Sequence, residues 1–211
     1  MKRELTLTAE ELFLLGKMLQ AKYLDYAYIR LMGDFTKNYQ LFEKKNQAEL
    51  IKKNVLILKD FKGNVEVSSW ARDLVIPVFE GATETTLDIR YIKNDIHVSE
   101  KYHYHKENVI KVSVEKGKLN ICRIESDVIK ERVSKIINEE YYVDKHILET
   151  MDEKKISEIY IVKKLVKGQA SIVNAYLKMN NVVYKEIEND KFESLEREEF
   201  ETEVWDVLKG E

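Results

Sequence analysis

Residues 85–125 read TTLDIRYIKNDIHVSEKYHYHKENVIKVSVEKGKLNICRIE, and their pattern indicates a set of consecutive β-strands. Its first segment has apolar or β-branched residues at every second position: Thr85, Leu87, Ile89 and Tyr91. A period of two is typical of β-strands with one buried face. Turn residues interrupt the pattern at 93–95 and 116–118. Short turns between consecutive strands predict an antiparallel meander.

The sequence upstream of this meander predicts helices. In LTAEELFLLGKML, residues 7–19, Thr8 is a good helix cap and Glu11 follows three residues later, which is the spacing of a capping box. Leu7 and Leu12 occupy the positions of a hydrophobic staple around that cap. Apolar residues then recur at helical spacing, so this helix should bury one face.

A second helix is predicted over residues 35–53, followed by a short hairpin and another helix. The hairpin covers VLILKDFKGNVEVS, residues 55–68, with its turn at 62–64. Ser68 is the expected cap of the helix SWARDLVIPVF, and Pro77 is expected to kink or stop that helix near its end. The order helix, hairpin, helix is that of a winged-helix segment.

The C-terminal part repeats the order of helices followed by strands. Ser126 is expected to cap a helix. A second helix is predicted from residue 144 or 152 to 167, although its middle, EIYIV, fits a strand equally well. Residues 170–190 predict a hairpin that turns at 180–181, and EREEFETEVWDVLKG, residues 196–210, predicts a short acidic helix.

Helices followed by strands, repeated once, predict an α+β fold with a central antiparallel β-sheet flanked by helices. Residues 1–211 are expected to form a single α+β domain. Its two α/β halves, 1–125 and 126–211, are expected to have a pseudo-twofold arrangement.

The composition is that of a globular protein and argues against several function classes. Hydrophobic residues make up 44% and charged residues 35% of the chain, which is enough for a core. A net charge of -3 lacks the basic surplus of most nucleic-acid binders, so no nucleic acid is expected as a partner. The one cysteine, Cys122, fits a reducing compartment. No apolar run is long enough to span a membrane, so a cytoplasmic protein without a membrane partner is expected.

Three of the four histidines fall within a short segment: His97, His103 and His105. Alternation along the strand places them, with Lys101, on a polar face that is expected to be solvated. Tyr102 and Tyr104 should then point to the packed side. A zinc site needs three or four ligands, and only His103 and His105 are near enough to each other on this face. No metal is therefore expected.

No catalytic motif is visible in the sequence. The seven glycines never cluster into a phosphate-binding loop. No nucleophile elbow, HExxH motif or cysteine pair occurs. The protein is therefore expected not to be an enzyme and to need no cofactor.

Two stretches follow the pattern of a known family. Residues 5–29, LTLTAEELFLLGKMLQAKYLDYAYI, combine a short strand, a leucine-rich helix with an acidic start and an extended apolar segment. Residues 48–79, AELIKKNVLILKDFKGNVEVSSWARDLVIPVF, combine a helix, an acidic-glycine turn and a second helix ending near proline. The positions that carry this second pattern are Leu50, Val55, Leu56, Asp60, Gly63, Leu74 and Pro77. These stretches resemble the EspG family, the cytosolic chaperones of type VII secretion, which often has glycine at the place of Asn54.

The resemblance implies a non-enzymatic cytosolic chaperone or adaptor that binds a helical type VII secretion substrate and keeps it soluble for export. The Lys-, Ile- and Asn-rich usage is typical of a low-GC Gram-positive bacterium, where proteins of similar pattern accompany loci that export LXG-type toxins. Family analogy places partner binding on the sheet loops and the C-terminal helix. The residues expected there are Tyr91, Lys93, Asp95, His103, His105, Phe200 and Trp205.

Two other functions remain open at this stage. The first is a winged-helix-type DNA-binding regulator that uses residues 45–80. The lysines that would contact phosphates in that case are Lys44, Lys45, Lys52 and Lys53. The second is a toxin immunity protein.

Overall fold

The computed structural model describes residues 4–33, 38–80, 85–93, 96–105, 108–125, 128, 147–148, 152–166, 169–188 and 191–209. The chain forms two compact units. The first comprises Met1–Thr85 and Tyr102–Ile124, and the second comprises Thr86–Lys101 and Glu125–Glu211.

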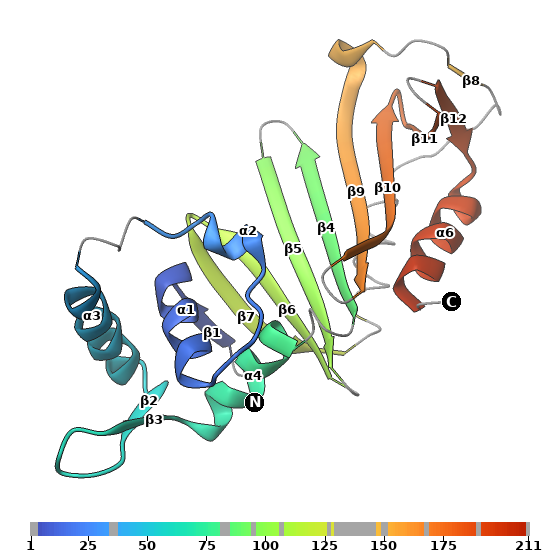
Figure 1. The fold of residues 1–211 in the computed structure, drawn as a ribbon. Helices are drawn as coiled ribbons and strands as arrows, with labels where there is room; N and C mark the ends of the chain where they lie inside the picture. Colours follow the sequence, from blue (N-terminus) through green and yellow to red (C-terminus); the bar gives the residue numbers. More distant parts are fainter. Residues whose placement is uncertain are drawn as a thin grey trace. The chain divides into compact units, whose positions relative to one another are not determined.

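The first unit combines helices with one end of the predicted meander (Figure 1). Its elements are β1 (Glu4–Leu7), α1 (Ala9–Met18), α2 (Tyr26–Ile29), α3 (Tyr39–Lys52), β2 (Leu56–Leu58), β3 (Val65–Val67), α4 (Ser69–Glu80), the end of β5 (Ile96–His105), β6 (Asn108–Glu115) and β7 (Lys118–Ile124). Its sheet has the strand order β1-β7-β6-β5, and β2 pairs with β3 in a separate antiparallel ribbon.

The core of the first unit lies between this sheet and its helices. The β1–β7 and β6–β7 pairs are antiparallel, and Ile121 of β7 lies opposite Leu5 on one side and Val112 on the other. Helix α4 packs on β6 and β7. The helical residues fully or almost fully buried in this core include Leu12, Leu14, Leu15, Leu74 and Val78. Burial of this apolar surface is the main force that holds the unit together.

Helix α1 begins as predicted. The Thr8 N–H donates to Glu11 Oε2 at 2.7 Å, and the Glu11 N–H donates to Thr8 Oγ1 at 3.2 Å, which completes the capping box. Leu7 and Leu12 are both fully buried in the same core cluster, as the staple requires.

Asn54 ends helix α3 in a left-handed cap. Its φ is 57°, and the Val55 N–H donates to Leu50 O at 2.9 Å across the end of the helix. Glycine is the usual residue in this conformation and asparagine tolerates it better than most others. The cap turns the chain into the β2–β3 hairpin, which forms where the sequence predicted it.

Helix α4 forms as predicted, but the prediction that Ser68 caps it was wrong. The Ser68 hydroxyl is buried and makes no hydrogen bond within the described part of the chain. Pro77 does not stop the helix, which continues to Glu80, while a kink at Pro77 stays a prediction. Proline has a helical φ and here removes one backbone hydrogen bond close to the helix end. The buried apolar face of α4 offsets that loss.

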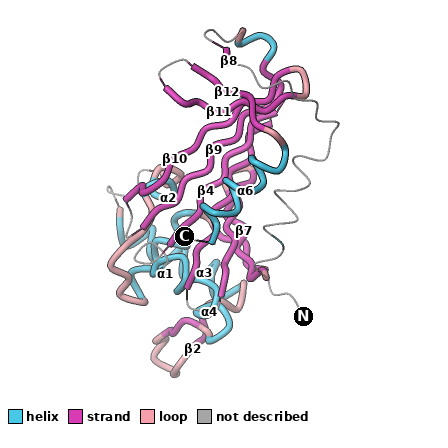
Figure 2. The backbone as a smooth tube through the Cα atoms, turned by 90° about the vertical axis from the view of Figure 1, so that its right-hand side faces the viewer, coloured by secondary structure: helices cyan, strands magenta, loops and turns pink. Residues whose placement is uncertain are grey.

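The second unit is mostly antiparallel strands with one C-terminal helix. Its elements are β4 (Thr85–Lys93), the start of β5, β8 (Ile147–Leu148), a 3-10 turn (Glu153–Lys155), β9 (Ile156–Val166), β10 (Gln169–Met179), β11 (Val182–Glu188), β12 (Lys191–Leu195) and α6 (Arg197–Lys209). The strand order is β5-β4-β9-β10-β11-β12-β8. Figure 2 shows β9 and β10 running side by side, and they pair over their length.

The hairpin of β10 and β11 turns where it was predicted. Asn180 and Asn181 have φ values of 50° and 61°, the pair of left-handed residues that a type I′ turn needs. The β6–β7 hairpin uses Lys116 and Gly117 in the same way, with φ values of 50° and 74°.

Ile156–Val166 form strand β9, so the helical interpretation of this segment was wrong and the strand interpretation of EIYIV is right. Only Glu153–Lys155 form a helical turn before β9 begins. The β-branched and aromatic residues of ISEIYIV favour an extended chain, and pairing with β10 satisfies its backbone. The helix predicted after Ser126 lies outside the described residues.

The predicted fold class is confirmed, because the protein is a mixed α+β fold with antiparallel sheets flanked by helices. The meander of 85–125 is formed by β4, β5, β6 and β7. The single domain and the pseudo-twofold arrangement of halves 1–125 and 126–211 stay predictions. The two compact units differ from these halves in the membership of residues 86–101 and of Glu125.

Candidate functional site

His103 is buried, so the prediction that it points to solvent was wrong. The residue is 0% exposed, and its Nε2 lies 2.8 Å from the Tyr28 hydroxyl of α2. Tyr102, on the opposite face of β5, is only 1% exposed. The strand is therefore covered on both faces at this point, and the rule that one face of a strand meets water does not hold here.

Lys101 was also expected on the solvated face, and it too is buried. Its Nζ lies 3.6 Å from Asp88 Oδ2 of β4, with both side chains almost fully enclosed. Removing two charges from water is costly unless they compensate each other, so the pair links the two strands of this hairpin.

Tyr104 and His105 end the same strand. Burial raises the pKa of Tyr104 to about 12, which agrees with the predicted packed side. His105 is mostly buried, and its Nε2 lies 3.4 Å from Glu80 Oε2 at the end of α4. His105 therefore faces a helix of its own unit rather than open solvent.

Phe200 anchors helix α6 to the sheet of the second unit. It is 2% exposed and packs edge-on against Tyr176 of β10, with 4.7 Å between the ring centroids. Glu203, one turn further along α6, accepts a hydrogen bond from the Tyr176 hydroxyl at 3.1 Å and pairs with Lys185 Nζ at 2.8 Å. Burial, and then the negative charge of Glu203, raise the pKa of Tyr176.

The structure brings these predicted partner-binding residues to different places. Tyr91 and Lys93 lie on β4 and Trp205 lies on α6, while Asp95 lies outside the described residues. His103 and Phe200 are interior side chains, so they can serve a partner site only by holding β5 and α6 in place. Partner binding by all of these residues stays a prediction.

A groove that sequence reasoning missed lies along α4 in the first unit. Its volume is about 610 Å³, within the usual range for a binding site. One wall is α4, and the other is the end of α1 with the loop that follows it. The apolar side chains that line it include Met18, Leu19, Ile76 and Phe79.

The loop wall is held by a tight helix cap. Gln20 has a φ of 56°, and the Ala21 N–H donates to Gly16 O at 2.8 Å, so the chain reverses at the end of α1. Gly16 also lets the Phe79 ring lie close to α1, because a Cβ at Gly16 would be 3.1 Å from the ring. We call this site the α1–α4 groove.

The charged residues of the α1–α4 groove differ in whether they contact other polar side chains. Lys22 and Arg72 are exposed, and neither side chain makes an ion pair or hydrogen bond with any residue in the described ranges. Glu80 is already in contact with His105. Burial, and then the charge of Asp25, raise the pKa of the Tyr23 phenol, whose ordinary value already keeps it protonated and able to donate at neutral pH.

One sequence signal could have revealed this groove. Helix α4 has more apolar residues than one buried face requires, since Leu74 and Val78 belong to the core, Ile76 lines the groove, and Phe79 is a core residue that also lines the groove. Arg72, Ile76, Phe79 and Glu80 recur at the spacing of one helix face. An amphipathic surface helix usually has a single apolar stripe.

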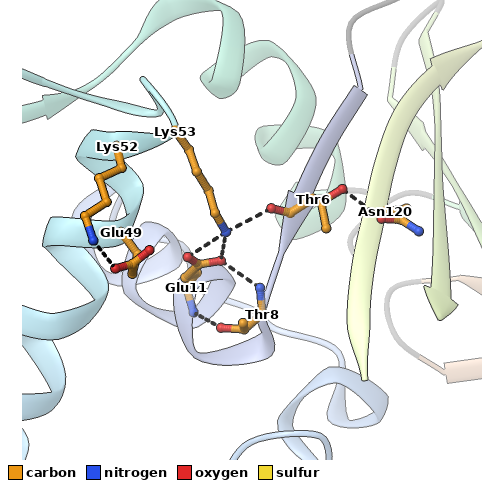
Figure 3. A network of polar contacts seen from close by, with 7 residues as sticks. All are labelled: Thr6, Thr8, Glu11, Glu49, Lys52, Lys53 and Asn120. Carbon is orange, nitrogen blue, oxygen red and sulfur yellow. Dashed lines mark hydrogen bonds and ion pairs between the residues drawn. The ribbon is translucent and has the colours of Figure 1, made fainter. Parts of the chain in front are cut away.

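Two of the four lysines of the winged-helix hypothesis, Lys52 and Lys53, already form ion pairs with carboxylates. Lys53 Nζ lies 2.6 Å from Glu11 Oε2 and donates to Thr6 O at 3.1 Å, and Lys52 Nζ lies 2.6 Å from Glu49 Oε1 (Figure 3). A phosphate would have to compete with a carboxylate at both positions. The β2–β3 hairpin instead exposes apolar side chains: Ile57, Leu58 and Phe61.

Among the described residues, no group of three or more His, Cys, Asp or Glu side chains is placed to hold a metal ion. The described helices include none with the length and apolarity needed to cross a bilayer.

Comparison with solved structures shows a similarity in fold. No family model and no curated protein match the sequence. The fold is similar to a solved structure described as the Mycobacterium tuberculosis type VII secretion system chaperone EspG5 in complex with a PE25–PPE41 dimer. The alignment covers 98% of this chain and 96% of the matched chain, with a TM-score of 0.63 and 6% sequence identity. The fold implied by the resemblance to the EspG family is thereby confirmed.

Proposed function

We propose that this protein is a non-enzymatic cytosolic chaperone or adaptor. It binds a helical type VII secretion substrate, such as an LXG-type toxin or its small helical partner, and keeps that protein soluble for export. The observation that carries this proposal is the likeness in fold, over nearly the whole of both chains, to a type VII secretion chaperone solved with a protein dimer bound.

The surface of the first unit has features that suit the binding of another protein. The β2–β3 hairpin exposes Leu58 and Phe61 to solvent, and the α1–α4 groove has an apolar lining with cationic residues at its edge. Exposed apolar patches on soluble proteins commonly mark interaction sites. Apolar side chains of a helical partner are recognised by such surfaces.

Co-expression tests the proposal. The protein should be produced with each helical secreted protein encoded beside its gene, and purified through a tag on the presumed substrate. We expect a soluble stoichiometric complex with one of them, and less aggregation of that substrate than when it is expressed alone. Absence of a complex with every neighbour would overturn the proposal.

The two rival functions give other outcomes in the same set of experiments. A DNA-binding regulator would bind DNA with an affinity that falls steeply as salt rises. An immunity protein would protect cells from a neighbouring toxin without helping its export. Either result, with no effect on substrate solubility, would replace the chaperone proposal.

A further inference from the structure

We propose that the α1–α4 groove is a docking site for a peptide segment that carries a large apolar side chain beside a carboxylate. This inference rests on the proposed function, since it assigns part of the partner's chemistry to one surface. None of the residues that line this groove is among those that the resemblance to the EspG family placed at partner binding.

The size and the apolar lining of the groove favour the binding of an apolar group. About 610 Å³ of open space lies over Met18, Leu19, Ile76 and Phe79. Water in contact with such side chains is released when an apolar group replaces it, which favours binding. Large apolar anchors in pockets provide most of the binding energy in many protein interfaces.

The positively charged residues of the groove favour an acidic group beside that apolar anchor. Lys22 on the loop wall and Arg72 on α4 contribute positive charges that form no ion pair with a described side chain. Glu80, the acidic residue among the lining side chains, lies 3.4 Å from His105, so the lining has two positive formal charges against one negative. The Tyr23 phenol adds a donor. A carboxylate can accept from all of these groups, and arginine binds carboxylates in a bidentate manner.

A peptide fits this chemistry better than a nucleotide. The chain has no glycine-rich loop to cradle phosphates, and the floor is formed by aliphatic side chains with a single phenylalanine. An amphipathic helix that lays its apolar face into a groove, with an acidic residue at the edge, matches both the floor and the rim.

The experiment uses the full chain and a defined probe. The probe is a fluorescein-labelled amphipathic peptide with leucine and phenylalanine on one face and glutamates flanking them. A second peptide has every glutamate replaced by glutamine. Fluorescence anisotropy measures the affinity of both peptides for the wild type, for Arg72→Glu, and for the double variant Lys22→Glu with Arg72→Glu.

We expect the glutamate peptide to bind more tightly than the glutamine peptide. The double charge reversal should weaken the glutamate peptide at least roughly tenfold, because it places like charges opposite each other. Arg123→Glu is the matched control, because Arg123 is an exposed residue of β7 outside the groove lining, and it should change the affinity little. Ile76→Trp, which fills the groove, should weaken both peptides.

Equal affinity for the two peptides, or no loss in the double variant, would overturn the inference. Both reversed residues are exposed, so these variants should fold, and circular dichroism checks this. Co-purification of a fatty acid that the double variant loses, with no peptide binding, would assign the groove to a lipid instead. A substrate complex that forms equally well with the double variant would leave the chaperone function intact and reject only the groove.

Discussion

The hydroxyl of Tyr28 lies 2.8 Å from Nε2 of His103, and both side chains are buried in the first unit. This contact joins α2 to β5 across 75 positions of the sequence. Tyr28→Phe keeps the ring but removes the hydroxyl, so the buried imidazole loses one polar partner. We expect the free energy of unfolding, measured in urea, to fall by about 1–2 kcal/mol. Tyr26→Phe, on the exposed face of the same helix, is the control, and an equal loss in both variants would contradict this account.

Two adjacent lysines make ion pairs of the same length in very different surroundings. Lys53 pairs with Glu11, whose side chain is 3% exposed, whereas Lys52 pairs with Glu49 at the surface. Lys53→Met should lower the free energy of unfolding by about 2 kcal/mol or more, because it leaves a buried carboxylate without its cation. Lys52→Met should change it by about 0.5 kcal/mol or less. Similar effects of the two substitutions in urea titrations would show that the depth of the pair does not matter.

Tyr104 should make the protein less stable at high pH. Its pKa is raised from 10.0 to about 12 by burial, so below pH 10 the phenol is protonated in both the folded and the unfolded chain. Between these two values the unfolded chain loses the proton first, and stability falls as pH rises. Tyr104→Phe should reduce that fall by an amount on the order of 2 kcal/mol. Urea titrations at several alkaline pH values measure it, and an unchanged slope would contradict the buried position of the phenol.

Phe200 should matter for the fold of the second unit. Phe200→Ala removes the ring that packs on Tyr176 and leaves a cavity under α6, and we expect a loss of about 3 kcal/mol. Thr202→Ala, at an exposed position of α6, is the control and should cost far less. Hydrogen exchange of the α6 amides would report this loss, and unaltered protection in Phe200→Ala would show that the ring does not anchor the helix.

Local sequence patterns predicted the helices and strands better than they predicted which of their side chains are buried. The alternation in 85–125 correctly gave four strands and their order, because the period of two and the turn residues are encoded locally. It could not show that Tyr28, far away in the sequence, covers the face of β5 that carries His103. The same limit explains the buried Lys101, whose partner Asp88 lies on another strand.

The α1–α4 groove shows the same limit for the candidate site. Its walls come from segments about 50 residues apart, so no short motif describes it. The second apolar face of α4 was readable from the sequence, but the loop wall depends on the left-handed conformation of Gln20, which residue type alone does not favour. In contrast, Thr8 and Glu11 follow a rule within one turn of helix, and that rule was sufficient.

If this protein binds a helical secreted substrate, the two proteins must form a complex when they are produced together. The protein and each helical secreted protein encoded beside its gene should be co-expressed, purified through the substrate, and analysed by size-exclusion chromatography with light scattering. We expect one soluble complex of fixed stoichiometry. Separate elution of the protein from every such partner would contradict it.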